Sequence, residues 1–240
     1  MIPLLIYEWE EIIQDDLCRM VFVMKEEKKQ YQQIEQYIKN PNFRKKQQEA
    51  IAYIIDQVEI INEELSGRYK RDVIDTIISR TKSAESIKKK LIRKGLPVNV
   101  QNVEERLHDL TGVRISCTFL DDVYKVAERL EKNHHFRIIR LKDYIKEPKS
   151  SGYRSIHMIL LVPVGPEEDI RVEVQVRTVG MNYWAKLDHQ LSYKAEENEE
   201  MDKIRRDLKF HAEEISRIDR NLLKIRTHIE KMKDKKFPEK

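Results

Sequence analysis

The clearest pattern of apolar and polar positions in the chain lies at residues 152–177. An apolar run follows His157, a Gly-Pro turn comes after it, and residues 170–177 then alternate strictly between apolar and polar. A period of two places successive side chains on opposite faces of a sheet, so both runs are predicted to be strands. Their short connection predicts an antiparallel hairpin.

The polar face of the second strand carries a carboxylate, an amide and two guanidinium groups, from Glu173, Gln175, Arg171 and Arg177. An antiparallel register can bring His157 close to Glu173. Taken by itself, such a pattern is more often a solvated strand face with a satisfied histidine. The other polar segments of the chain favour a functional site.

Two helices are predicted before this hairpin from the helical spacing of apolar residues. They cover residues 8–39 and about 43–65, with a break at residues 40–42 between them. The second helix should end at Ser66 and Gly67. Neither carries a chemical motif, and we interpret both as packing elements.

Capping signals predict two further helices in the middle of the chain. Asn102 with Glu105 resembles a capping box, and Asp121 or Asp122 should cap the helix after it. Alternating or apolar runs complete the predicted elements, which are a strand at 113–119, a strand at 135–141 and a helix from about residue 179.

The last segment, residues 196–236, is predicted to be one long helix with an acidic start and a basic end. Ten positions in it recur at alternating steps of three and four, and nine of them are apolar. A heptad pattern of this length indicates a helix–helix seam, within the chain or between chains. The positions are Met201, Ile204, Leu208, His211, Ile215, Ile218, Leu222, Ile225, Ile229 and Met232.

Together these elements predict an α/β fold of the α+β kind, a mixed β-sheet flanked by helices, with N-terminal helices and a long C-terminal helix. We expect an N-terminal helical extension at 1–67, a catalytic domain at 68–194 and a helix for oligomerisation at 195–240.

Charge changes this picture in one place. The net charge of the 240 residues is only +4, yet residues 80–94 carry seven Lys or Arg against one Glu. So concentrated a charge suits phosphate groups. No apolar run is long enough to span a membrane, the first residues lack the features of a signal peptide, and Cys18 and Cys117 are too few for a disulfide framework. We therefore expect a cytoplasmic protein without a membrane partner.

The basic segment contains a predicted helix that begins at Ser83 and ends before Gly95. Helical spacing places Ser86, Lys90 and Arg93 on one face of it. Arg80 and Lys82 come just before the helix, where free amides and the helix dipole favour anions. A polyphosphate receptor and a solvated basic helix are both compatible with this pattern.

Two carboxylates add a chemical possibility. Asp109 lies at a predicted helix-to-strand turn, Arg114 follows on the polar face of the strand, and Glu173 stands on the hairpin. Two carboxylates that converge with a polyphosphate receptor suggest Mg²⁺-assisted transfer of a phosphoryl-type group. The His108-Asp109 pair does not indicate an HD-type phosphohydrolase, because no earlier histidine could complete its metal site.

Several other sites are excluded by their missing motifs. The sequence has no Walker A pattern and no Gly-x-Gly-x-x-Gly fingerprint, so neither a P-loop nor a Rossmann turn holds a nucleotide. It also has no Cys/His cluster at zinc spacing and no Gly-x-Ser-x-Gly elbow.

Four motifs in order resemble the synthetase domain of RelA/SpoT proteins, over about residues 76–194. The chain is too short for the hydrolase and regulatory domains of that family, so it resembles the stand-alone small alarmone synthetases, and no hydrolase activity is expected. The motifs are Arg80-x-Lys82-x-x-x-Ser86-Ile87, Asp109-x-x-Gly112-x-Arg114, Asp143-Tyr144-Ile145-x-x-Pro148-Lys149-x-x-Gly152-Tyr153-Arg154-Ser155-Ile156-His157 and Glu173-Val174-Gln175-Val176-Arg177-Thr178 with Trp184-Ala185.

The resemblance implies a nucleotidyltransferase-like fold and transfer of the β,γ-pyrophosphate of ATP to the ribose 3′-OH of GDP or GTP. It implies that the carboxylates of Asp109 and Glu173 hold Mg²⁺ and that Glu173 takes the 3′-OH proton. It implies ATP contacts from Arg80, Arg114, Lys82, Ser86, Lys90 and Arg93. It implies acceptor contacts from Lys149, Tyr153, His157 and Gln175.

The family resemblance also makes a homotetramer the expected assembly. The sequence departs from the family pattern in two places. Asp188 stands where many relatives carry Glu, and residues 76–78 differ from relatives that bind product in an allosteric cleft, so stimulation by pppGpp is not expected.

Two other classes of function fit the sequence less well. An RNA-binding module could use residues 80–94 with Tyr144 and Tyr153 as stacking groups, but Asp109 and Glu173 would repel a nucleic-acid backbone. We therefore expect no obligate nucleic-acid partner. A scaffold built on the terminal helices leaves the polar sheet face unexplained.

Overall fold

A computed structural model describes residues 25–26, 28–166, 168–192 and 198–236. These residues form two compact units, one up to Lys46 together with Lys82–His108, the other Gln47–Thr81 together with Asp109 onward. The predicted helix at 8–39 is present over 28–39, and its residues 8–24 lie outside the described part of the chain.

The first unit contains the basic helix α3 (Ala84–Arg93) and the short helix α4 (Val100–Arg106). Ser83 caps α3 as predicted, because its hydroxyl accepts a hydrogen bond from the backbone N–H of Ser86. Gly95 ends it with a φ of 65°, the left-handed conformation that glycine adopts freely. The predicted cap at Asn102 is wrong. The side chain of Asn99 caps α4 instead, three residues earlier, by accepting from the N–H of Asn102.

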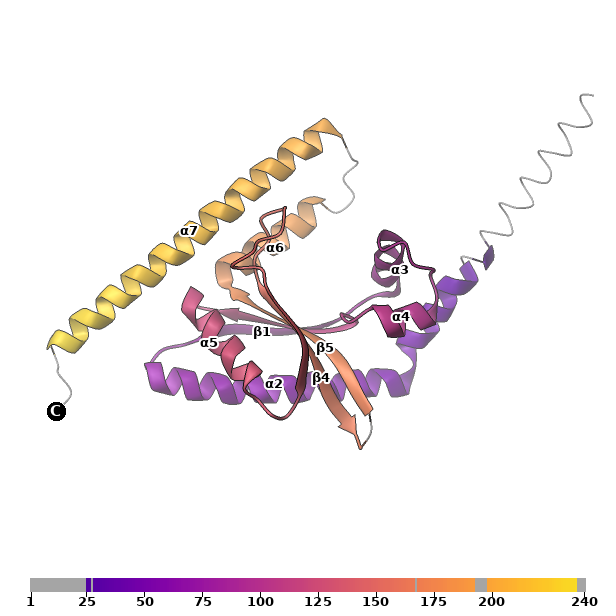
Figure 1. The fold of residues 1–240 in the computed structure, drawn as a ribbon, viewed down its shortest axis with the longest axis horizontal. Helices are drawn as coiled ribbons and strands as arrows, with labels where there is room; N and C mark the ends of the chain where they lie inside the picture. The colour runs from indigo at the N-terminus through magenta and orange to yellow at the C-terminus, as the bar shows by residue number, and fades with distance from the viewer. Residues whose placement is uncertain (1–24, 27, 167, 193–197, 237–240) are drawn as a thin grey trace, which may run out of the picture. The chain divides into compact units, whose positions relative to one another are not determined.

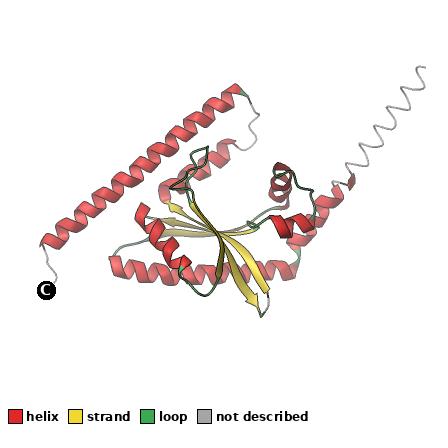
Figure 2. Ribbon diagram, viewed as in Figure 1, coloured by secondary structure: helices red, strands yellow, loops and turns green. Residues whose placement is uncertain are grey.

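The second unit is built on a mixed five-stranded sheet (Figure 2). Its strand order is β1-β2-β5-β4-β3, with β2 and β5 parallel and every other pair antiparallel. The predicted mixed sheet and hairpin are confirmed. The strands are β1 (Ile74–Thr81), β2 (Thr111–Cys117), β3 (Arg137–Asp143), β4 (Ile156–Gly165) and β5 (Glu168–Thr178).

Helices α2 (Pro41–Tyr69) and α5 (Leu120–Glu131) bury the apolar face of this sheet (Figure 1). From Gln47 on, α2 belongs to the second unit. The predicted end of this helix at Ser66 and Gly67 is wrong, because the helix continues to Tyr69. The main core residues are Ala50, Ile54, Val58, Leu65, Val113, Ile115, Val123, Val126, Leu130, Met158, Leu160, Val172, Val174 and Val176.

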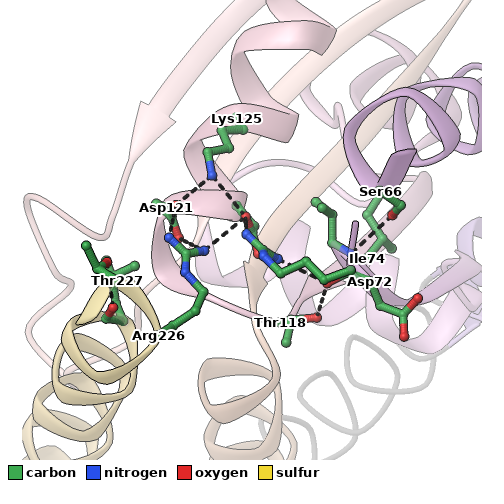
Figure 3. A network of polar contacts seen from close by, with 12 residues as sticks. Ser66, Asp72, Ile74, Thr118, Asp121, Lys125, Arg226 and Thr227 are labelled. Carbon is green, nitrogen blue, oxygen red and sulfur yellow. Dashed lines mark hydrogen bonds and ion pairs between the residues drawn. The ribbon is translucent and has the colours of Figure 1, made fainter. Parts of the chain in front are cut away.

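The predicted cap of α5 by Asp121 or Asp122 is also wrong. Phe119 occupies the N-cap position and makes no side-chain cap hydrogen bond. Both aspartates lie in the first turn and pair with arginines from other elements (Figure 3). Asp122 accepts two hydrogen bonds from Arg71, at 2.7 and 2.6 Å, and Asp121 accepts two from Arg226, at 3.0 and 2.8 Å. Charge pairing therefore takes precedence over capping.

Two helices follow the sheet, α6 (Val179–Ser192) and α7 (Glu199–Lys236). The predicted long C-terminal helix is confirmed. It packs on its own chain, because the indole N–H of Trp184 donates to the carbonyl of Leu208 at 2.8 Å and the hydroxyl of Thr178 donates to Asp219 at 2.6 Å. The outer apolar positions of α7 stay exposed at 43–56%, and they are Ile218, Leu222, Ile225, Ile229 and Met232.

Among the described residues, no helix is both long enough and apolar enough to cross a membrane. Cys117 is a free thiol buried in β2, and burial raises its pKa above the usual value. Cys18 lies outside the described residues.

Candidate functional site

The face of the sheet opposite the core carries two neighbouring rows of side chains. The strand registers align the residues of each row across β1, β2, β5, β4 and β3. One row contains Arg80, Gly112, Glu173, Ile159 and Arg140, and the next contains Ile78, Arg114, Gln175, His157 and Lys142. Residues far apart in the sequence thus meet on one surface.

Glu173 stands at the middle of these rows. Its Oε1 lies 3.3 Å from Nδ1 of His157, its Oε2 accepts a hydrogen bond from Gln175 at 2.7 Å, and Nη2 of Arg80 lies 3.7 Å away. The predicted proximity of His157 and Glu173 is confirmed. Burial raises the pKa of Glu173, but the hydrogen bond and charge of His157 outweigh it, so the pKa lies below its usual value. Glu173 is therefore ionised at neutral pH.

Gly112 lies in close contact with the backbone of Glu173 and beside the side chain of Arg80. A Cβ at position 112 would lie 3.3 Å from the backbone oxygen of Glu173 and 3.5 Å from Nε of Arg80. The first distance is tighter than most Cβ contacts, so a larger residue would press on the backbone of Glu173, whereas the distance to Arg80 is ordinary van der Waals contact. The close contact with the backbone of Glu173 favours glycine between Asp109 and Arg114 in the motif.

Three arginines gather beside the carboxylate. Burial, and the charges of Arg80 and Arg177, lower the pKa of Arg114 to about 10. Arg177 is only 3% exposed, and burial lowers its pKa as well. In both Arg114 and Arg177, Nε is buried without a hydrogen-bond partner among the described residues. Desolvated cations that repel one another favour a bound anion.

Arg177 was missed as a site residue. The strand alternation placed it on the polar face together with the exposed Arg171, and only its place in the motif that begins at Glu173 distinguished the two arginines. In the structure the distinction is burial, which depends on neighbouring elements. The guanidinium of Arg177 also hydrogen-bonds Tyr153.

An aromatic and basic group lies at the β4 side of the site. The hydroxyl of Tyr153 is 2.9 Å from Nε2 of His157. Burial raises the pKa of the Tyr153 hydroxyl. Nζ of Lys149 lies 4.8 Å from the ring centre of Tyr153 and 4.7 Å from that of Tyr144. Tyr144 was assigned a role only in the RNA-binding alternative. Its ring packs edge-on against His157 at 5.1 Å.

Asp109 supplies the second carboxylate. It is 8% exposed, it precedes β2, and its charge acts to raise the pKa of Glu173. Two carboxylates fit Mg²⁺, which prefers oxygen ligands and takes one or two from protein and the rest from phosphates and water. No group of three or more Asp, Glu, His or Cys able to hold a metal occurs within the described residues. Such an ion would therefore depend on substrate oxygens.

The remaining predicted residues belong to the first unit. The hydroxyl of Ser83 lies 3.0 Å from that of Ser86, at the first turn of α3. Lys90 and Arg93 follow at helical spacing, while Ile87 and Leu91 are buried. The predicted basic face of the helix is present, and Lys82 directly follows the last residue of β1. The other eight predicted residues, which are Arg80, Asp109, Arg114, Lys149, Tyr153, His157, Glu173 and Gln175, all lie in the second unit.

Comparison with known proteins gives consistent relatives. GTP pyrophosphokinase YwaC of Bacillus subtilis is 37% identical over 174 residues, which are 71% of this chain and 82% of that protein. GTP pyrophosphokinase YjbM of the same organism is 37% identical over 160 residues, 65% of this chain and 74% of that protein.

Solved structures agree in fold. Small alarmone synthetase 1 of Bacillus subtilis is similar with a TM-score of 0.70 and 30% identity, over 81% of this chain and 99% of that one. A GTP pyrophosphokinase family protein of Streptococcus pneumoniae gives a TM-score of 0.69 and 31% identity, over 80% of this chain and 94% of that one. A family profile described as a region found in RelA and SpoT proteins matches residues 79–198. The chain therefore belongs to the RelA/SpoT family.

Proposed function

We infer that this protein is an ATP:GTP/GDP 3′-pyrophosphokinase, which makes the alarmone (p)ppGpp and AMP. One observation carries the inference. An ionised, largely buried Glu173, held by His157 and Gln175, faces a group of desolvated guanidinium groups. This combination suits a base that works beside phosphates. The names of its relatives, GTP pyrophosphokinases, support the same reaction.

The proposed reaction is a single displacement. The ribose 3′-oxygen of the acceptor attacks the β-phosphorus of ATP, and its proton passes to Glu173. The bond from that phosphorus to the oxygen bridging it to the α-phosphate breaks, and AMP leaves with the electron pair. The hydrogen bonds from Gln175 and His157 keep the carboxylate of Glu173 in a fixed orientation, as a general base requires.

Binding of ATP is assigned to the basic residues. We propose that Arg80 and Arg114 contact the adenine, and that Lys82, Ser86, Lys90 and Arg93 hold the phosphates. Asp109 and Glu173 would hold Mg²⁺, which supplies neutralisation of the transferring phosphates when bound. Arg177 joins this set, because its buried charge beside Arg114 favours an anion.

Binding of the acceptor is assigned to the aromatic and basic group. We propose that Tyr153 stacks on the guanine, that Lys149 and His157 contact the acceptor phosphates, and that Gln175 supports Glu173. The edge-on contacts of Tyr144 with Tyr153 and His157 help to hold their rings in place.

The direct test uses purified protein with Mg²⁺, ATP and an acceptor. AMP should form with GDP or GTP and stop when EDTA removes the metal. AMP release without any guanine nucleotide would indicate plain hydrolysis of ATP. Tight binding of single-stranded RNA without AMP formation would favour the RNA-binding alternative.

Because both substrates are nucleotides and Cys117 is a free thiol, we place the enzyme in the cytoplasm.

Tyr153→Ala should weaken binding of GDP or GTP by roughly fivefold to a hundredfold and leave ATP binding within about twofold, because stacking on a base contributes about 1–3 kcal/mol. Tyr183→Ala is the matched control, since Tyr183 is 61% exposed on α6. Isothermal titration calorimetry measures both nucleotides. Equal losses for ATP and GDP in Tyr153→Ala would contradict the acceptor assignment.

We also propose that the enzyme assembles through α7 as a homotetramer, the state implied by the family resemblance. The stripe from Ile218 to Met232 is an apolar helix face left uncovered by the described chain. A second α7 from another subunit fits it, since the spacing of three and four suits helix–helix packing. The stripe is the part of the heptad pattern that remains available for a seam between subunits.

Leu222→Glu combined with Ile225→Glu should yield a smaller species, because two charges would be buried in the seam. Asn221→Glu, an exposed position of the same helix, is the control for added charge. Light scattering coupled to size-exclusion chromatography reports the mass. An unchanged mass in the folded double variant would place the subunit contact elsewhere.

A further inference from the structure

A tight turn connects two residues of the acceptor group. The N–H of Gly152 donates to the carbonyl of Lys149 at 2.8 Å, and the N–H of Lys149 donates to the carbonyl of Tyr153 at 3.2 Å. Gly152 has a φ of 89°, which residues with a side chain rarely adopt. The two hydrogen bonds fix the backbone of Tyr153 relative to that of Lys149. Where the turn lies therefore determines where both side chains lie.

The turn rests directly on α7. A Cβ at position 152 would lie 2.7 Å from Cβ of Ala212 and 3.3 Å from Cα of Lys209. Gly152 and Ala212 are both buried, and Ala212 is 4% exposed. The contact thus joins the two smallest residue types, and a Cβ at position 152 does not fit between the turn and the helix.

The segment after the turn is also influenced by the charges of α7. The guanidinium of Arg154 donates to the carbonyl of Ile145 at 3.1 Å. Burial, and then the charge of Arg220 on α7, lower the pKa of Arg154. The charges of α7 therefore also act on the residue that follows Tyr153.

Contacts on both sides of Ala212 fix the helix in its place. One turn before it, the carbonyl of Leu208 accepts from Trp184, and two turns after it Asp219 accepts from Thr178. Thr178 closes β5, the strand that carries Glu173, and its oxygen also accepts from the N–H of Met181 in the first turn of α6. These contacts fix the position of α7 relative to β5, the strand that carries the proposed base Glu173.

We propose that Ala212 is a positioning residue of α7, which sets the turn at Gly152 and through it the guanine-binding Tyr153 relative to Glu173. The contact between Ala212 and Gly152 affects binding of the acceptor and not binding of ATP. This inference rests on the acceptor role proposed for Tyr153. It assigns to a residue of the C-terminal helix a part in the selection of the acceptor.

Ala212→Leu places three extra carbons where the turn now lies, so the turn must move. The KM for GDP or GTP should rise about tenfold or more, since displacement of a bound group by about 1 Å can cost up to a hundredfold. The KM for ATP should stay within about twofold. Ala212→Ser, which adds one small atom, should return the acceptor KM close to that of the wild type.

Ile215→Ala is the matched control. Ile215 lies on the same face of α7 but meets α6, because a Cβ at Gly180 would lie 2.9 Å from its Cγ2. This variant should lose thermal stability and keep the KM for GDP or GTP. If Ile215→Ala raised that KM as much as Ala212→Leu, the effect would be general loosening of α7 and the proposal would be overturned.

Calorimetry of GDP and ATP binding distinguishes a failure of this inference from a failure of the proposed function. If Ala212→Leu is too unstable to assay, Ala212→Val takes its place in the binding measurement. Wild-type protein that does not bind GDP contradicts the proposed function itself. Wild-type binding with an unchanged GDP affinity in Ala212→Leu or Ala212→Val contradicts only the positioning role. Equal losses of GDP affinity and ATP affinity in the variant also contradict the positioning role.

Discussion

Glu173→Gln should form AMP at least about 10²-fold more slowly than the wild type, because a 3′-hydroxyl is a poor nucleophile until a base takes its proton. The amide is nearly isosteric with the carboxylate and can still accept from Gln175. It cannot take a proton, and it is a weaker ligand for Mg²⁺. We therefore expect a folded variant that assembles and binds nucleotides. AMP release at saturating ATP and GDP measures the effect.

Glu168→Gln is the control for this experiment, since Glu168 is exposed at the start of the same strand. Its turnover should match that of the wild type. Melting curves of both variants confirm folding. A well-folded Glu173→Gln enzyme with normal turnover would remove Glu173 from the mechanism.

Asp122→Ala should lower the free energy of unfolding by about 3–5 kcal/mol, the range for removal of one partner from a buried ion pair. The side chain of Asp122 is 0% exposed and that of its bidentate partner Arg71 is 17% exposed. Lys125 and Arg226 also lie within 3.3 and 3.8 Å of the carboxylate. The substitution would leave these cations without their buried counter-charge (Figure 3).

Glu230→Ala provides a comparison within the same network. Its carboxylate is 45% exposed and lies 3.8 Å from Arg71 and 3.4 Å from Arg226, so its removal should cost no more than about 1 kcal/mol. Denaturant unfolding followed by circular dichroism gives both values. Equal losses in the two variants would show that burial of Asp122 does not control the strength of the network.

The hairpin was predictable because each of its strands carries a full local signal. The apolar residues of β5 alternate and face the core, while Glu173 and Gln175 face the site. β1 was not predicted as a strand. Within the described residues it is an edge strand that pairs with β2 alone, and most of its side chains are exposed on both faces. Its residues therefore show no apolar alternation, although Arg80 depends on it for its position.

The C-terminal helix shows a different limit of prediction from the sequence. Its heptad pattern predicted the helix correctly and indicated a seam, but several of its contacts to its own chain come from small or polar residues. Ala212, Asp219 and Arg226 do not stand out in a hydrophobic pattern. Their roles depend on partners such as Gly152 and Thr178, which are distant in sequence.

The candidate site was predicted in composition and only partly in its contacts. The motifs identify Glu173 and His157, and the strand register brings them together. The burial of Arg177 and the ring contacts of Tyr144 depend on how separate strands and loops pack. Such contacts follow from the tertiary structure, and no single-segment pattern contains them.

The most direct measurement of the central claim follows the two terminal phosphates of ATP. The protein is incubated with Mg²⁺, GDP and ATP labelled at its β and γ positions, and the products are separated and identified by mass spectrometry. We predict unlabelled AMP and, in equal amount, guanosine tetraphosphate with both labelled phosphates on its 3′-oxygen. Formation of ADP with a single labelled phosphate on the acceptor, or of AMP without labelled guanosine tetraphosphate, would contradict the account.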